Sequence, residues 1–157
     1  MELTKATIEH AEYIGKIHSL AWKQAYEGIF PEEYLQNDTA EKRRMEFLDS
    51  LIDPSIQYYL IQHEESTIGI VKLNVNDAIC EIQSIYLLKE YCNLGIGSDV
   101  IKYIVQTWRY HIIMLWTLEE NYKARRFYEK NHFVQTSETR IIPRGQKYKQ
   151  VQYVYTI

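Results

Sequence analysis

Between Ile79 and Thr117 the sequence carries a strand pattern, a glycine-bearing loop, a helix pattern and a second strand pattern, an order that few folds can accommodate. The apolar run Ile79 to Leu87 leads through a short polar turn to Gly95 and Gly97, and apolar residues at helical spacing follow. The second run, Ile112 to Thr117, has the length of a buried strand. Because parallel neighbours need such a crossover helix, this segment predicts a parallel pair of strands.

Short β-rich runs precede this segment, and alternating runs follow it. The runs are Gln57 to His63, Thr67 to Asn74 and Ile79 to Leu87. The gaps between them are too short for a parallel crossover, so the three runs predict an antiparallel meander. Two alternating strands, Phe133 to Ile141 and Tyr148 to Ile157, close the chain around a turn at 143–145.

Helical periodicity dominates the N-terminal third. Apolar residues recur at three- and four-residue steps from His10 to Ala25 and again from Ala40 to Leu51. A later helix is predicted from about Asn121 to Lys130. This order of elements describes an α/β (mixed α+β) fold in one domain, residues 1–157. We expect a central mixed, mostly antiparallel sheet of six to seven strands, flanked by about four helices.

Composition excludes several classes of protein. With 157 residues, 46% of them hydrophobic, the chain can bury a core without covalent staples. The formal charge of -3 offers no net attraction for nucleic acid or for an anionic membrane, so we expect neither as a partner. The N-terminus lacks the basic and apolar segments of a signal peptide, and no apolar run could span a bilayer. A cytoplasmic location is therefore expected.

Neither the cysteines nor the histidines form a pattern of metal ligands. Cys80 and Cys92 have no CxxC spacing, which favours reduced thiols, and the five histidines occur singly along the chain. We therefore expect no metal site.

The glycine loop is suited to hold a diphosphate. Gly95 and Gly97 lack a Cβ, so the backbone can take φ > 0 and approach a ligand closely, beside the free N–H groups of a helix start. A Walker A loop would need a lysine after the second glycine, and a dinucleotide fingerprint would need a third glycine where Val100 stands. The loop therefore favours neither ATP hydrolysis nor NAD binding.

Two segments resemble the cofactor-binding segments of the GNAT acetyltransferase superfamily. The loop from Cys92 to Gly97 resembles the motif (Gln/Arg)-x-x-Gly-x-(Gly/Ala), with Cys92 in place of Gln or Arg. The segment Asn121 to Phe133 resembles Asn-x-x-Ala-x-x-Phe-Tyr-x-x-x-Gly-Phe, with His132 in place of glycine. Because Ala21 to Pro31 is also similar to the first helix and acceptor-side loop of many members, the likeness covers nearly the whole chain.

The resemblance implies a co-substrate and the residues that bind it. The co-substrate is acetyl-CoA, with its diphosphate on the glycine loop and its pantetheine arm along the preceding strand. The residues implied to contact it are Ile85, Leu87, Cys92, Asn93, Leu94, Gly95, Ile96, Gly97, Ser98, Asn121, Tyr128 and Lys130. Two have structural alternatives, because Asn121 can simply cap its helix and a lysine at a helix end, such as Lys130, often binds nothing.

The resemblance also implies direct transfer of the acetyl group to a primary amine, in a cleft where the fourth and fifth strands diverge. Tyr128 is expected to protonate the departing thiolate, and the backbone N–H of Leu87 to stabilise the oxyanion. The alternative for Tyr128 is that its ring only packs in the core.

A carboxylate is expected to accept the proton of the amine through a water molecule. Glu81 is the first candidate, because strand alternation would place it on one face with Gln83 and Ile85. Glu119 and Glu120, at the end of the next strand, are competitors, and each of the three can equally be a solvated carboxylate at a strand edge.

The acceptor side is expected to be aromatic. Trp22, Tyr26 and Phe30 would form its wall, although helix packing explains them equally well, while Glu27 and the pair Glu32-Glu33 would attract a cationic amine. We therefore predict an acetyl-CoA-dependent N-acetyltransferase for a polyamine or another small cationic amine. The alternatives are a peptide or protein N-acetyltransferase and a non-catalytic acyl-CoA-binding sensor or scaffold. The C-terminal strand could also pair in a homodimer.

Overall fold

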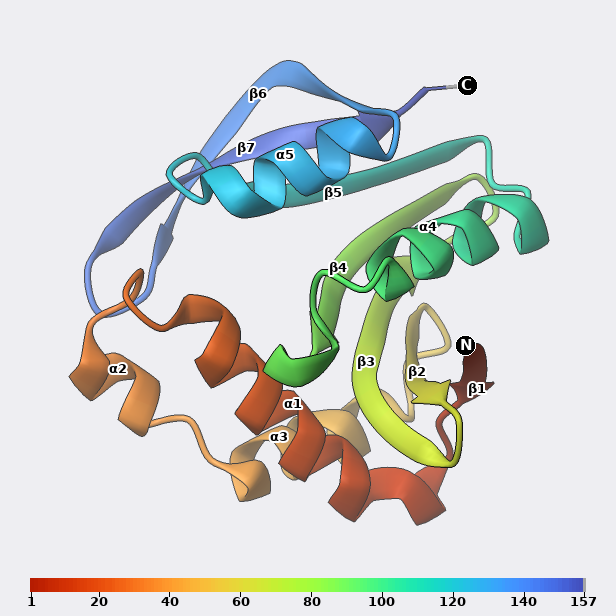
Figure 1. The fold of residues 1–157 in the computed structure, drawn as a ribbon, viewed down its shortest axis with the longest axis vertical. Coiled ribbons are helices and arrows are strands. Elements are labelled where there is room, and N and C mark those ends of the chain that lie inside the picture. Colours follow the sequence, from red (N-terminus) through yellow and green to blue (C-terminus); the bar gives the residue numbers. More distant parts are fainter. Residues whose placement is uncertain (157) are drawn as a thin grey trace.

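The structure is a computed structural model that describes residues 1–156. Its seven strands form one sheet in the order β1-β2-β3-β4-β5-β7-β6 (Figure 1). The strands are β1 (Glu2–Lys5), β2 (Ile56–His63), β3 (Ser66–Val75), β4 (Ile79–Leu87), β5 (Ile112–Leu118), β6 (Phe133–Pro143) and β7 (Lys147–Tyr155). The helices are α1 (Ala11–Tyr26), α2 (Glu32–Gln36), α3 (Ala40–Ser50), α4 (Ile96–Thr107) and α5 (Tyr122–Lys130), with 3-10 turns at Ile8–His10 and Lys89–Tyr91.

The predicted fold class is confirmed. The strands β2, β3 and β4 form the antiparallel meander, and β4 pairs with β5 in parallel. Two elements were not predicted. The strand β1 is four residues long and buries only Leu3, too little to show an alternating pattern. The helix α2 begins directly after Pro31 and has only five residues, which are too few to show helical periodicity in the sequence.

The C-terminal strand lies inside the sheet. Because β7 pairs with β5 on one side and β6 on the other, the prediction that it pairs across a dimer is wrong, and β6 is the outer strand. Ile157, which was predicted to belong to this strand, lies outside the described residues. No helix within residues 1–156 has the length and apolar character needed to cross a bilayer.

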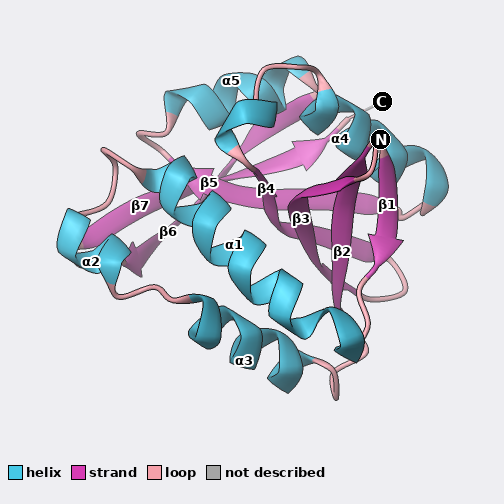
Figure 2. Cartoon of the chain, turned by 60° about the horizontal axis from the view of Figure 1, so that its bottom comes forward, coloured by secondary structure: helices cyan, strands magenta, loops and turns pink. Residues whose placement is uncertain are grey.

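Helices cover both faces of the sheet, because alternate side chains of its strands point to opposite sides. Tyr58 and Leu60 pack with Ile14 of α1 and Phe47 of α3 on one face (Figure 2). Ile61, Val71 and Leu73 pack on the other face with the apolar side of α4 and with Phe127 of α5.

The middle of the sheet opens. The strands β4 and β5 pair only from Ile79–Ile112 to Ile82–Leu115. Beyond this point β4 continues with β3, and β5 continues with β7, so the two strands diverge toward their C-terminal ends (Figure 1). The opening that was predicted between the fourth and fifth strands is therefore present.

A β-bulge in β4 decides which side chains enter this opening. Leu73 pairs with Ile82 and Lys72 with Ser84, which leaves Gln83 without an opposite residue. The extra residue reverses the alternation, so Ile85 packs against the core beneath α4. The prediction that Glu81 and Ile85 share a face is therefore wrong.

Candidate active site

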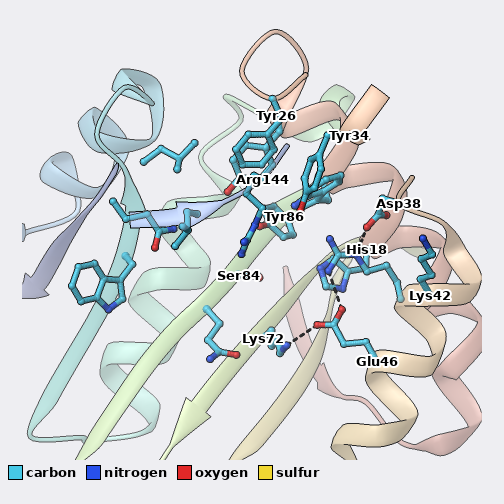
Figure 3. A pocket seen from close by; sticks show the side chains of 18 of the residues that line it. His18, Tyr26, Tyr34, Asp38, Lys42, Glu46, Lys72, Ser84, Tyr86 and Arg144 are labelled. Carbon is cyan, nitrogen blue, oxygen red and sulfur yellow. Dashed lines mark hydrogen bonds and ion pairs between the residues drawn. The ribbon is translucent and has the colours of Figure 1, made fainter. Parts of the chain in front are cut away.

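A cavity of about 500 Å³ lies where β4 and β5 diverge, beneath α1, α2 and α3 (Figure 3). The strands β3, β6 and β7 also contribute side chains to its lining. Four residues predicted for the acceptor side or for catalysis line it together: Trp22, Tyr26, Phe30 and Glu81.

The aromatic residues of the acceptor side both pack and line the cavity. The rings of Tyr26 and Phe30 stack with centroids 4.4 Å apart, and Trp22 lies 5.9 Å from Phe30. Trp22 and Phe30 are only 7% and 6% exposed, so most of each ring is buried in the cluster. The two interpretations of this stretch are therefore compatible.

Of the three candidate carboxylates, only Glu81 reaches the cavity. Glu119 forms an ion pair with Lys149 at 3.0 Å, and neither Glu119 nor Glu120 lines the cavity. The acidic residues predicted to attract a cationic acceptor also lie elsewhere. Glu27 and Glu32 border a separate hollow of about 200 Å³ on the outer side of α1 and α2.

Three tyrosines gather near the divergence of the strands. Burial raises the pKa of Tyr26 well above its usual value, with a further contribution from the neighbouring Tyr86 hydroxyl. Burial and Tyr86 also raise the pKa of Tyr128. The ring of Tyr128 packs on Phe127 and Phe133, but its hydroxyl has no hydrogen-bond partner within residues 1–156. Because Tyr128 remains protonated at neutral pH, this hydroxyl is available to donate a proton.

A row of free backbone N–H groups begins on the opposite side of β4. Gly95 has φ 85 at the start of α4, and Asn93 has φ 64. The first amide of this stretch that bonds to a backbone carbonyl is that of Asp99, which donates to Gly95 O at 3.1 Å. Within the described chain the N–H groups of residues 93–98 have no hydrogen-bond partner, so this loop can hold an anion such as a diphosphate.

The structure gives a different reason for the second glycine of the loop, Gly97. Gly97 has no positive φ and belongs to α4. A Cβ at Gly97 would lie 3.0 Å from Phe127 Cζ and 3.9 Å from Leu87 Cδ1. Gly97 therefore does not use the positive φ that a glycine can adopt, and close packing between α4 and α5 explains this glycine instead.

The other residues of the two cofactor-binding segments differ in their surroundings. The thiol of Cys92 points back to the carbonyl oxygens of Leu88 and Leu87, at 3.6 and 3.8 Å, as expected of an ordinary loop residue. Asn121 Oδ1 accepts from Ala124 N and caps α5, while Lys130 is exposed at the end of that helix. His132 has φ 69, so this histidine adopts the conformation that the family's glycine would take without strain.

The end of β4 presents its amides to the opening. Leu88 N donates to Ile68 O of β3 at 2.8 Å. Because amide direction alternates along a strand, the N–H groups of Leu87 and Ile85 point away from β3, toward the diverging β5.

A charged cluster at one end of the cavity was not predicted from the sequence. Arg43 pairs with Asp38 at 2.7 Å and with Glu46 at 2.9 Å, and Lys72 pairs with Glu46 at 2.7 Å. Burial acts to raise the pKa of Glu46, but Lys72 and Arg43 outweigh it and lower this pKa to about 2. Beside them lies His18, whose pKa burial lowers to about 3 and whose Nδ1 has no partner among the described residues. The one sequence feature that could have indicated this cluster is His18, a histidine on the apolar face of α1.

No group of three or more His, Cys, Asp or Glu side chains in the described part of the chain could hold a metal ion.

Comparisons with known proteins show the family of the chain. The sequence model of the acetyltransferase (GNAT) family matches residues 10–133. A spermidine N(1)-acetyltransferase from Thermoplasma acidophilum is 28% identical over 141 residues, which are 85% of this chain and 88% of the relative.

Solved structures share the fold. The PaiA N-acetyltransferase from Thermoplasma acidophilum, crystallised with coenzyme A, superposes with a TM-score of 0.72 at 23% identity over 98% of each chain. A spermidine/spermine N-acetyltransferase from Vibrio cholerae gives a TM-score of 0.68 at 15% identity, over 98% of this chain and 90% of the other. Because the family model covers well over half of the sequence, this chain belongs to the GNAT family of acetyltransferases.

Proposed function

We propose that the protein transfers the acetyl group of acetyl-CoA to a primary amine within a ternary complex. The observation that carries this proposal is the arrangement of two sites around β4. Gly97, in the loop of free amides at residues 93–98 (the amide loop), lies so close to Phe127 that an added Cβ would be 3.0 Å from its ring. Phe127 is followed by Tyr128, whose pKa is raised in part by Tyr86, a residue that lines the cavity. A cofactor on the loop and an amine in the cavity would therefore meet at the end of β4.

The fit between the residues and acetyl-CoA rests on the free amides. Residues 93–98 offer N–H groups for the diphosphate, and Ile85 and Leu87 offer theirs to the pantetheine arm and to the oxyanion. The loss of the usual side chain at Cys92 leaves these backbone donors in place. Acetyl-CoA supplies the thioester carbonyl that the amine attacks, forming the C–N bond as the C–S bond breaks.

Two side chains would carry out the proton transfers. An alkylamine has a pKa near about 10 and must lose a proton before it attacks. Glu81 accepts this proton, directly or through a water molecule, from its place in the cavity lining. Tyr128 donates its hydroxyl proton to the departing thiolate, because a tyrosine hydroxyl is protonated at neutral pH.

The acceptor has support from one source. The relative from Thermoplasma acidophilum acts on spermidine according to its name, which supports a polyamine or another small cationic amine. The identity of 28% makes spermidine the first acceptor to test, alongside peptides with free amino groups.

Release of free thiol from acetyl-CoA tests the proposal. The protein is incubated with acetyl-CoA and, one at a time, spermidine, L-lysine, short alkylamines and peptides. We expect turnover with at least one small primary amine. Calorimetric binding of CoA without turnover on any amine would instead favour a sensor or scaffold, and absence of CoA binding would reject both functions.

The amide loop gives a sharper test of the cofactor site. Replacing Gly95 with Ala puts a Cβ on a residue with φ 85, which costs about 1–2 kcal/mol unless the loop relaxes and turns its amides away. We expect the Kd for CoA to rise about tenfold, measured by calorimetry.

A matched control is available for this substitution. Gly28 has φ 78 and, like Gly95, no atom within 4 Å of an added Cβ. Gly28→Ala should therefore lose similar stability against unfolding while its affinity for CoA stays at the native value. Equal CoA affinities in the two variants would argue against the loop as the cofactor site.

A further inference from the structure

The cavity carries more positive than negative charge. Five cationic side chains line it against three carboxylates. Two of the cations, Arg43 and Lys72, are compensated by the ion pairs with Asp38 and Glu46 described above. This leaves three cations, Lys42, Arg140 and Arg144, which share a single carboxylate, that of Glu81.

The two arginines of this set bond only to neutral groups. Arg140 Nε donates to Gln150 Oε1 at 2.6 Å, and its guanidinium lies 4.4 Å above the ring of Trp116. Arg144 Nη1 donates to the carbonyl oxygen of Pro143 at 2.6 Å. Within residues 1–156 neither guanidinium has a carboxylate oxygen within 4.0 Å, so each keeps donors free for an anion.

The arginines also influence one another. Burial lowers the pKa of Arg140, the charge of Glu81 acts to raise it, and the charge of Arg144 lowers it further. Two like charges that are close enough to interact repel, and an anion between them would relieve this repulsion.

The position of Arg144 is fixed by packing. It lies in the turn between β6 and β7, where Gly145 has φ 80 and approaches α2 so closely that a Cβ would lie 3.0 Å from Tyr34 Cβ. Tyr148 donates its hydroxyl to Ile29 O at 3.0 Å and ties the same hairpin to the loop after α1. Figure 3 shows Arg144 beside Tyr26 and Tyr86, and its charge acts on the pKa of Tyr26.

These cations are separate from the proposed cofactor site. None of residues 88–98 lines the cavity, and the free amides lie on the other side of β4. A diphosphate on the amide loop would therefore not neutralise Arg140 or Arg144, whereas the anionic group of a ligand in the cavity would lie beside them.

We infer that the acceptor is a primary amine that also carries an anionic group, a carboxylate or a phosphate, bound by Arg144 and Arg140. This inference rests on the proposed acetyl transfer, but it assigns an acceptor of another class than the polyamine that the name of the relative supports. The planar guanidinium fork matches the oxygens of carboxylate and phosphate and forms paired hydrogen bonds to them. A polyamine, which has only cationic groups, would meet this end of the cavity with like charge.

Pairs of amines that differ in the anionic group test the inference. L-lysine and 1,5-diaminopentane differ by the carboxylate, and 3-aminopropyl phosphate and 3-amino-1-propanol differ by the phosphate. In the thiol-release assay we expect at least one anionic member to exceed its partner, and to exceed spermidine, by about tenfold or more in kcat/KM. We expect Arg144→Gln to remove this preference, mainly by raising KM.

Three further variants sharpen the test. Arg144→Lys keeps the charge but loses the fork, so it should retain only part of the preference. Arg140→Gln should show a smaller loss, because Arg140 is exposed at the rim. Arg109→Gln removes an exposed arginine after α4 that does not line the cavity and should behave as the native protein. Thermal unfolding verifies that each variant is folded.

The outcomes separate this inference from the proposed function. Turnover that favours spermidine or 1,5-diaminopentane, unchanged in Arg144→Gln, would overturn the inference and leave acetyl transfer standing. If no amine is acetylated, acetyl transfer fails, and calorimetry with 3-aminopropyl phosphate and L-lysine decides on anion recognition. Binding that Arg144→Gln abolishes supports the anion site, and absence of binding overturns it.

Discussion

Replacing Tyr128 with Phe should lower kcat about a hundredfold and leave the Kd for CoA unchanged. The substitution removes the hydroxyl that is proposed to protonate the thiolate, and a positioned acid of this kind contributes about 10²–10⁴ in rate. The ring and its contacts with Phe127 and Phe133 remain, so the fold should be unaffected. Thiol release measures kcat, and calorimetry measures CoA binding.

The same helix offers a control for this prediction. Tyr122 is 62% exposed on α5, and Tyr122→Phe likewise removes one hydroxyl without removing a ring. Its kcat should match that of the native enzyme. An unchanged kcat in Tyr128→Phe would instead assign Tyr128 to packing alone, the alternative that its sequence position left open.

Replacing Glu46 with Ala should lower the free energy of unfolding by about 2 kcal/mol. Glu46 accepts from Lys72 at 2.7 Å, from Arg43 at 2.9 Å and from the Tyr58 hydroxyl at 3.3 Å. The side chains of Lys72 and Arg43 are only 18% and 17% exposed, so the variant leaves two cations partly buried near each other. The loss stays below that of a fully buried pair, about 3–5 kcal/mol, because Glu46 itself is 37% exposed. Urea denaturation measures the change.

The pH dependence of stability provides a second readout for Glu46. Its pKa in the folded protein, about 2, lies below the usual value of 4.5. The unfolded chain therefore binds the proton first, and the contribution of Glu46 is complete above pH 4.5 and is lost as the pH falls toward 2. The variant should lack this part of the acid destabilisation. Glu41→Ala breaks an exposed pair with Arg44 on the same helix and should change the free energy of unfolding far less than Glu46→Ala does.

Local patterns predicted the elements that are long enough to carry a period. The meander β2 to β4, the parallel partner β5 and the helices α1, α3, α4 and α5 all follow from such patterns. What failed were properties that depend on a single residue or on a neighbouring element. The bulge at Gln83 reverses the alternation of side chains along β4 without changing the β-rich composition. At position 97 a glycine is needed because Phe127 leaves no room for a Cβ.

The candidate site was predictable where one segment forms it. Gly95 and the amides that follow it belong to one continuous loop, as does the aromatic stretch around Trp22. The charge of the cavity was not predictable, because Arg43 and Lys72 are distant in sequence from Arg140 and Arg144 and line the same cavity only in the folded protein. A net charge of -3 for the whole chain says nothing about the sign inside one cavity.

The short pairing of β4 with β5 has a consequence for solubility. A strand with unpaired backbone groups at the rim of a sheet is a template on which another chain can add a strand and begin to aggregate. Here the unpaired ends of β4 and β5 lie in the middle of the sheet, inside an opening that is narrow at the paired end of the two strands, and not at the edge strands β1 and β6. The protein can therefore keep backbone donors open to a small molecule without offering them to a second polypeptide.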